Sequence, residues 1–276
     1  MQSLKQKLES IAQSQQGLPF SVYSSVTDQH LLNVPIVKPL LICILGGEKR
    51  LGDHAQPNSS DTVCAVGDFI FLSNMPNINM RNISQKTEYF ALLIGFEFED
   101  FAIFNKRPAQ TKPFFTGKLD NLLVQTLDQF VDWSPSAPET LWHTRRQELL
   151  LLLYHMGHKQ VSAIAEPPSL SHKVEILIGS NIELDSSSES IAKQLAMSDS
   201  TLRRKLALEN THFQTLKDRV KLGHGLHLLQ TSGLPIGLVA EQCGYQSQSR
   251  FTDKFKSLFG LTPSELRKTK LHEKGE

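Results

Sequence analysis

The sequence predicts an α+β protein of two domains. The chain has 276 residues, which is enough for two cores, because single domains usually run about 100–150 residues. Short apolar runs separated by turn residues fill residues 18–99 and indicate strands. After residue 113 the apolar residues recur at helical spacing, which indicates helices up to the C-terminal tail.

The N-terminal strands are most evident in three apolar runs: LLICIL at 40–45, FIFL at 69–72 and YFALLIGFEF at 89–98. Runs of this length with Gly, Pro, Asn and Asp between them are typical of strands. Their number predicts a small β-barrel or sandwich.

Two helices are expected within residues 118–158, on either side of the WSPSAPE break. The segment AEPPS at 165–169 is a compact chain breaker and the best domain boundary. We therefore expect an N-terminal domain over 1–166 and a C-terminal, all-helical domain over 167–276.

The C-terminal part contains the same plan twice. SIAKQLAMSDSTLRRKLAL and IGLVAEQCGYQSQSRFTDKF each hold a short apolar helix with a central alanine, a turn, a serine of N-cap type and a second helix with a polar first turn. This is the pattern of a helix-turn-helix. We expect one motif at about 188–208, a second at about 235–259, and a linking helix at about 213–230.

The second helix of such a motif enters the major groove of DNA with its N-terminus first, where Arg can bond guanine and Gln can bond adenine. Its amide end also favours phosphate. Arg203 and Arg204 cannot be separated by sequence: one reads bases while the other touches phosphate. The DNA-binding candidates are Ser200, Arg203, Arg204, Ser247, Gln248, Ser249 and Arg250, with Lys217 and Lys256 as phosphate contacts.

At these residues the sequence resembles the AraC/XylS family of bacterial transcription regulators. The resemblance rests on LLQTSGLPIGLVAEQCGYQSQSRFTDKFKSLFGLTPSELRK at 228–268 and LAMSDSTLRRKL at 195–206, and covers about residues 172–270. It implies two helix-turn-helix units that dock in successive major grooves on one side of the DNA. More weakly, the stretch from Leu31 to Gly52 with VGDFIFLSNMPNINM looks like the cupin-type sensor and dimerisation domain, a β-barrel, found in part of that family.

Three positions depart from the family pattern. Gly223 and Gly225 interrupt the linking helix, and each costs about 1 kcal/mol relative to alanine. Gly225 falls where the family usually has a small alanine, but Gly223 has no explanation in the sequence. Asp253 lies one turn into the second recognition helix, where it either accepts from cytosine N4 or pairs with a neighbouring lysine; the second interpretation is favoured.

The N-terminal strands predict an apolar interior that could hold a small effector with an apolar body. The basic residues that could meet an acid group at its rim are Lys38, Lys49, Arg50 and Arg81. An interior filled by side chains, without a ligand, is the alternative.

Composition excludes several other classes. Cys43, Cys64 and Cys243 lack CxxC spacing, and His54 is the single histidine of the 40–98 barrel region, so neither a metal site nor a cofactor is expected. No catalytic arrangement is present, and we expect no enzyme. Residues 1–169 carry 14 basic and 16 acidic residues (net −2) and residues 170–276 carry 15 and 12 (net +3), which permits a polyanion partner. No membrane span or export signal is evident, so a cytoplasmic protein is expected.

These observations predict a transcription regulator that binds double-stranded promoter DNA beside RNA polymerase as a homodimer. The resemblance implies an activator whose N-terminal domain responds to an effector or to dimerisation. The leucine-rich segment 141–156 is the best candidate dimer surface, or else is buried between domains. The alternative function is a small-molecule-binding adaptor that acts by protein contact without DNA.

Overall fold

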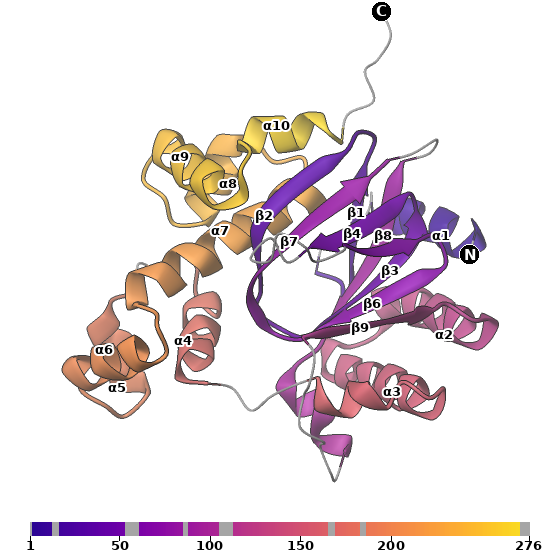
Figure 1. Cartoon of the computed structure of the whole chain (residues 1–276), viewed down its shortest axis with the longest axis horizontal. Coiled ribbons are helices and arrows are strands. Elements are labelled where there is room, and N and C mark those ends of the chain that lie inside the picture. The colour runs from indigo at the N-terminus through magenta and orange to yellow at the C-terminus, as the bar shows by residue number, and fades with distance from the viewer. Residues whose placement is uncertain are drawn as a thin grey trace, which may run out of the picture.

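A computed structural model describes residues 2–12, 17–52, 61–84, 88–104, 113–164, 169–182 and 186–270 of the chain (Figure 1). In the N-terminal part an α-helix, α1 (Gln2–Ala12), precedes the strands, and two further α-helices and short 3-10 helices come after β8. The strands are β1 (Ser21–Ser25), β2 (Gln29–Ile36), β3 (Leu40–Gly46), β4 (Glu48–Gly52), β5 (Thr62–Ala65), β6 (Asp68–Leu72), β7 (Met75–Ile83), β8 (Tyr89–Gly95) and β9 (Phe114–Lys118). The helices after β8 are η1 (Phe98–Ile103), α2 (Asn121–Trp133), η2 (Ser134–Ser136), η3 (Glu139–Leu141), α3 (Trp142–His155) and η4 (Lys159–Ala163).

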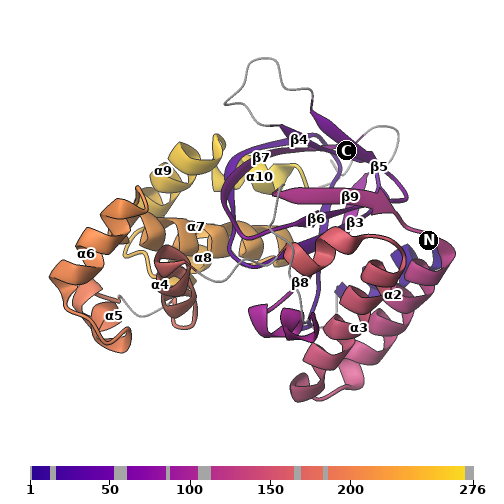
Figure 2. The ribbon, with the colours of Figure 1, turned by 60° about the horizontal axis from the view of Figure 1, so that its bottom comes forward.

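The strands form two antiparallel sheets. One has five strands in the order β1-β8-β3-β6-β9, and the other has four in the order β2-β7-β4-β5. Within the described residues the two sheets stay separate, so of the barrel and the sandwich that the sequence predicted, the structure forms the sandwich, with two facing sheets and no closed barrel (Figure 2). His54, named above as a barrel histidine, lies outside the described residues.

The five-stranded sheet is buried on both faces, which explains its unbroken apolar runs. Side chains alternate between two clusters: Leu41 and Cys43 of β3 point to one face, and Ile42 and Ile44 point to the other. The first face packs against α1, α2 and α3, and the second faces the four-stranded sheet. The N-terminal helix α1 was not predicted; its Leu4 and Leu8 are fully buried in the first cluster.

The leucine run of α3 serves this same cluster. Leu149, Leu150 and Leu153 are fully buried against the sheet side of the domain, whereas Leu151 is 40% exposed. Most of the run is therefore core, and only one of its five leucines is open on the surface. Whether this surface forms a dimer stays a prediction.

The C-terminal part is helical throughout its described residues. Its helices are α4 (Leu170–Gly179), α5 (Ser188–Gln194), α6 (Asp199–Leu208), α7 (Phe213–Thr231), α8 (Ile236–Gln242), α9 (Gln248–Phe259) and α10 (Pro263–Lys268). The expected division at residue 166 stays a prediction, because residues 165–168 lie outside the described part of the chain.

The helix α7 connects two separate cores. Its N-terminal half supplies Leu216 and Val220 to a cluster with α4, α5 and α6. Its C-terminal half supplies Leu222, Leu226 and Leu229 to a cluster that also holds α8, α9 and α10. The single continuous helix therefore fixes how the two halves of the C-terminal part are placed relative to each other (Figure 1).

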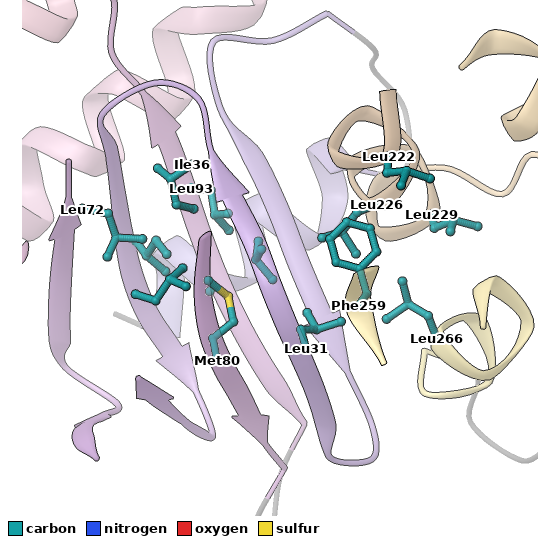
Figure 3. Packing of buried hydrophobic residues seen from close by; sticks show 14 of the residues in the cluster. Leu31, Ile36, Leu72, Met80, Leu93, Leu222, Leu226, Leu229, Phe259 and Leu266 are labelled. Carbon is teal, nitrogen blue, oxygen red and sulfur yellow. The ribbon is translucent and has the colours of Figure 1, made fainter. Parts of the chain in front are cut away.

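The second of these cores continues into the N-terminal sandwich. Figure 3 shows the cluster running from Leu72 and Met80 between the sheets to Leu226, Phe259 and Leu266 in the helices. The contacts pass through β1 and β2, the edge strands of the two sheets.

Both glycines of α7 are explained by close approaches. A Cβ at Gly225 would lie 2.8 Å from the Phe251 ring, and a Cβ at Gly223 would lie 3.0 Å from Pro35 of β2. Gly225 therefore allows α9 to cross α7, and Gly223 allows α7 to lie on β2. Despite the two glycines, α7 is continuous over 19 residues.

Candidate nucleic-acid interface

The two predicted motifs have the same backbone plan in the structure. In α5 and α8 the central Ala192 and Ala240 are buried, and each accepts a hydrogen bond at its carbonyl from the amide five residues on, Met197 at 3.0 Å and Tyr245 at 2.9 Å. This backbone bond closes the helix in the manner of a Schellman motif.

The residue before the closing amide is left-handed in both motifs. It is Ala196 in the first, with φ 54°, and Gly244 in the second, with φ 67°. The second turn then has one more residue than the first, because the next cap is Ser198 in one motif and Ser247 in the other.

Each recognition helix begins at a capping serine. The Ser198 hydroxyl accepts from the Thr201 amide at 3.2 Å and opens α6, and the Ser247 hydroxyl accepts from the Arg250 amide at 3.3 Å and opens α9. A serine cap satisfies one of the amides that a helix start leaves unpaired.

The back of α9 is fully buried, as expected. Phe251, Phe255 and Phe259 have no exposed surface and pack ring against ring. Its first turn is exposed: Gln248, Ser249 and Arg250 are all open to solvent, as is Lys256 further along. The helix therefore buries its phenylalanine face and exposes its polar first turn.

The first recognition helix is arranged in the same way on Leu202 and Leu206, which are fully buried. Ser200, Arg203 and Arg204 are exposed, but they differ in their partners. Arg203 pairs with Asp199 at 2.7 Å and with Glu189 at 3.7 Å, whereas no ion pair of Arg204 is present in the described part of the chain. The structure thus distinguishes two arginines that the sequence could not.

When the capping serines Ser198 and Ser247 are aligned, each position of α6 has a counterpart in α9. Ser200 matches Ser249, and Arg204 matches Asp253, which is exposed on α9. The two helices therefore present opposite charges at the same place, one turn in from the cap.

The remaining predicted contact, Lys217, lies on α7. Its ammonium donates to the carbonyl of Ser186 at 2.9 Å, immediately before α5. Nearby, the buried Lys221 donates to the carbonyl of Gly244 at 3.2 Å and so holds the turn of the second motif.

The second motif is fixed to the N-terminal domain by backbone as well as apolar contacts. Asn33 of β2 has a left-handed backbone at φ 49°. Its side-chain amide donates to the backbone carbonyl of Leu258 at 3.1 Å. The Val26 amide donates to the carbonyl of Thr269 at 2.7 Å. These bonds join the end of α9 and the end of α10 to the edge of the sandwich.

A row of polar side chains crosses the inner face of the four-stranded sheet. Cys64, Lys49, Asn82 and Gln29 occupy neighbouring register positions on β5, β4, β7 and β2, and all four are buried. Lys49 donates to the Asn82 side-chain oxygen at 2.6 Å, and the Asn82 amide donates to Gln29 at 2.8 Å. Lys49, Asn82 and Gln29 thus form one hydrogen-bonded series inside an apolar core.

Gln29 carries this series into the C-terminal domain. Its oxygen also accepts from Gln230 of α7 at 3.1 Å, and its nitrogen donates to the Thr269 hydroxyl at 2.6 Å. A second polar contact joins β1 to α7 nearby, where the Tyr23 hydroxyl and His227 Nδ1 are 3.1 Å apart. We call these contacts between the sandwich and the C-terminal helices the joint between the domains. Burial, with a smaller contribution from His224, lowers the pKa of His227 to about 4, so this imidazole is neutral at neutral pH.

The four residues expected at an effector rim are not equivalent. Lys49 is a correction: it lies inside the sandwich rather than at its rim, with 3% exposure, and burial lowers its pKa to about 7. Lys38 pairs with Glu97 at 2.6 Å and Arg50 with Glu48 at 2.5 Å on the outside, and Arg81 lies on β7 in register with Arg50. The structure does not bring the four together.

Two clefts lie where the domains meet. The larger, about 400 Å³, is lined on one side by Phe20 and Val22 and on the other by His224, His227 and Leu228. The smaller, about 370 Å³, is also lined by Phe20 and His227, and it adds Lys38, Tyr23 and Arg146.

Several residues of this joint were missed by sequence reasoning. Gln29, Asn82 and Gln230 are ordinary polar residues in the sequence, and only their burial makes them notable. A polar residue at an inward position of an alternating strand is the one pattern that could have indicated Asn82.

Among the described residues no cluster of His, Cys, Asp and Glu could hold a metal ion. None of the helices in the same part of the chain is long and apolar enough to cross a bilayer.

The comparison with known proteins agrees with this geometry. A family model described as a helix-turn-helix domain matches residues 191–269. The regulator GadX of Escherichia coli K12 is 35% identical over 98 residues, and the regulator AdiY of the same organism is 33% identical over 94. Residues 191–269 therefore form a helix-turn-helix domain similar to that of these regulators, as the resemblance to the AraC/XylS family predicted. The match covers 36% of GadX and 37% of AdiY, so the chain spans well under half the length of these relatives.

Solved structures extend the likeness to the fold of the whole chain. ToxT from Vibrio cholerae superposes with a TM-score of 0.67 over 93% of this chain and 100% of ToxT, at 17% identity. A structure of ToxT with a bound unsaturated fatty acid gives a TM-score of 0.65 over 93% of this chain and 97% of that one, at 15% identity. At this identity the likeness concerns the fold alone: an N-terminal β-domain followed by a helical C-terminal domain.

The left-handed residues of the two turns generate a reciprocal prediction. Replacement of Ala196 by glycine is expected to stabilise the protein by about 0.5–1 kcal/mol, because the cost of a left-handed Cβ exceeds the greater flexibility of unfolded glycine. Gly244→Ala is expected to destabilise by a similar amount. Thermal unfolding followed by circular dichroism measures both, and a loss of stability in Ala196→Gly would contradict the assignment.

Lys49 generates a prediction about pH. Because its folded pKa of about 7 lies below the unfolded value of 10.5, the unfolded state binds more protons above pH 7, and stability rises with pH there. In Lys49→Met this contribution should vanish, so the variant's advantage over the wild type should shrink between pH 7 and 8.5. Urea unfolding at several pH values measures this difference. An advantage that stays constant with pH would show that Lys49 is not buried as a titrating amine.

Proposed function

We propose that the protein is a sequence-specific DNA-binding transcription regulator. The observation that carries the proposal is the pair of serine-capped helices, α6 and α9, each buried along its back and exposed at its first turn. A helix presented in this way fits the major groove and can offer side chains to base edges. The relatives GadX and AdiY, which match this domain, are transcription regulators by name.

In this proposal Arg250 and Gln248 read bases from the second motif and Arg204 reads bases from the first. Arg203 is held by Asp199, so it serves as a phosphate contact with Lys217 and Lys256. Ser200, Ser247 and Ser249 line the two helix starts. A homodimer would bind two half-sites beside RNA polymerase, and activation would be the direction of regulation. No catalysis is proposed, and none of the relatives named above is an enzyme by name.

The N-terminal domain would modulate this activity through its joint with α7–α10. ToxT, which shares this fold, has been solved with an unsaturated fatty acid. We propose that an effector with an anionic head and an apolar body occupies the clefts between the domains, where Phe20 and Leu228 supply apolar walls. The cations of the smaller cleft are Lys38 and Arg146, which pair with Glu97 and Asp100, so the anionic head would share or replace these acidic partners.

DNA binding tests the main proposal. The wild-type protein should select a duplex from a random pool, and its affinity for that duplex should fall linearly with log salt, because bound phosphates release counterions. Arg250→Ala should lose about 1–3 kcal/mol of affinity and relax the preference at one base pair. Fluorescence anisotropy measures both effects.

The matched control is Arg145→Ala, which removes a partly exposed arginine of α3 that pairs with Glu148 and lies over the Trp133 ring. It should leave DNA binding unchanged. A wild-type protein that selects no duplex and shows no salt dependence would refute the DNA-binding proposal and favour a protein-binding adaptor.

Ligand binding tests the effector proposal. Oleate below its micellar concentration should raise the unfolding temperature, because a ligand at 100 times its Kd adds about 2.7 kcal/mol to the stability of the folded state. Oleyl alcohol, which lacks the carboxylate, should have a smaller effect. Leu228→Trp, which fills the larger cleft, should reduce the oleate shift. An absent shift, together with a mass spectrum of the denatured protein that contains only buffer components, would count against a fatty-acid-like effector.

A further inference from the structure

Another cleft lies within the C-terminal domain, apart from the two clefts between the domains. It is a cleft of about 450 Å³ between α7, the turn of the second motif and the start of α9. Its walls are formed by Lys217, Asp218 and Lys221 on one side and by Tyr245, Arg250 and Lys254 on the other.

The cleft is strongly positive. Four cations, Lys217, Lys221, Arg250 and Lys254, line it together with one acid, Asp218, so its formal charge is +4 − 1 = +3. The whole chain carries only +1. Concentration of cations around a concavity favours an anion in it, because the walls focus the field.

Three of the four cations of the cleft are held in place by the protein itself. Lys221 is buried and bonded to the Gly244 carbonyl, Lys217 is bonded to the Ser186 carbonyl, and Lys254 pairs with Asp218 at 2.9 Å. A ligand would therefore meet side chains that are already positioned and would lose less conformational entropy on binding.

Tyr245 supplies an independent sign of a ligand. Its hydroxyl oxygen is buried, yet it has no hydrogen-bond partner among the described residues. Burial raises the pKa of this phenol, and the nearby charges of Asp218 and Arg250 also act on it. A buried hydroxyl without a partner costs free energy, and an anionic oxygen in the cleft would accept a hydrogen bond from it.

The position of the cleft identifies the source of the anion. Lys217 touches the chain just before the first motif, and Arg250 lies in the first turn of the second recognition helix. The cleft therefore lies between the two reading helices. A duplex that offers successive major grooves to both helices must pass its intervening sugar-phosphate backbone across this place.

We infer that the cleft seats a backbone phosphate of the duplex segment between the two major grooves, with the Tyr245 hydroxyl as a donor to it. The inference rests on the proposed DNA-binding function and adds a contact that carries no base information. Such contacts fix the register of a protein on DNA and set the salt dependence of its affinity.

Three variants test it on the duplex selected by the wild type. Tyr245→Phe should weaken binding about tenfold, the effect of one hydrogen bond to a charged group, without lowering the unfolding temperature. Lys254→Ala should reduce the slope of log K against log salt by about 0.9. Asp218→Asn, which removes the one acid of the cleft, should strengthen binding. None should change the preferred sequence.

Lys118→Ala is the control, because it removes an exposed lysine of β9 in the N-terminal domain. The inference is overturned if the wild type binds its duplex while Tyr245→Phe and Lys254→Ala bind with unchanged affinity and slope. It is also overturned if Tyr245→Phe unfolds at a lower temperature, or if these variants change the preferred sequence. A wild type that binds no duplex would refute the proposed function itself, and the two failures are therefore distinguishable.

Discussion

The apolar cluster that begins between the two sheets and continues into α7, α9 and α10 is the interaction on which the arrangement of this protein depends. It covers the edges at β1 and β2, which would otherwise present unpaired backbone groups. The same contacts fix the second helix-turn-helix motif against the N-terminal domain. If the N-terminal domain senses an effector, as proposed, the shared core lets it influence the second motif directly, without a separate signalling element.

The two helix-turn-helix motifs are supported by different cores. The first motif has its own small core with α4 and the start of α7, and that core contains no residue of the N-terminal sandwich. Its contact with the N-terminal domain includes the ring pair of Phe98 and His172, 4.8 Å apart. Any change at the sandwich edge would therefore reach the second motif first and would reach the first motif through α7.

Polar groups within the joint make it specific as well as tight. An apolar surface alone would tolerate small shifts, but Gln29 satisfies its hydrogen bonds with Asn82, Gln230 and Thr269 in one geometry only. Lys49 is buried at the other end of this series of hydrogen bonds and has no carboxylate partner in the described part of the sandwich. A titratable amine is therefore connected, through Asn82 and Gln29, to the contact between the domains. Buried networks of this kind are sensitive to any change in one member.

The sequence alone determined the local features of the protein. Serine caps, the glycine after α8, the phenylalanine period and the repeated motif all depend on residues within a few positions of one another, so the spacing of side chains contains them. The continuous apolar strands were also evident, because burial on both faces leaves no polar alternation.

The tertiary structure decided what depends on distant segments. Sequence reasoning left a barrel and a sandwich open and placed Lys49 at the rim, since nothing in a strand's own residues tells whether two sheets close or which side chain points inward. Gly223 had no explanation until α7 was seen against Pro35, and Tyr245 had no role until its hydroxyl was seen buried beside Lys221 and Arg250. These features arise from contacts between residues far apart in the chain, and local propensity and spacing carry no information about such contacts.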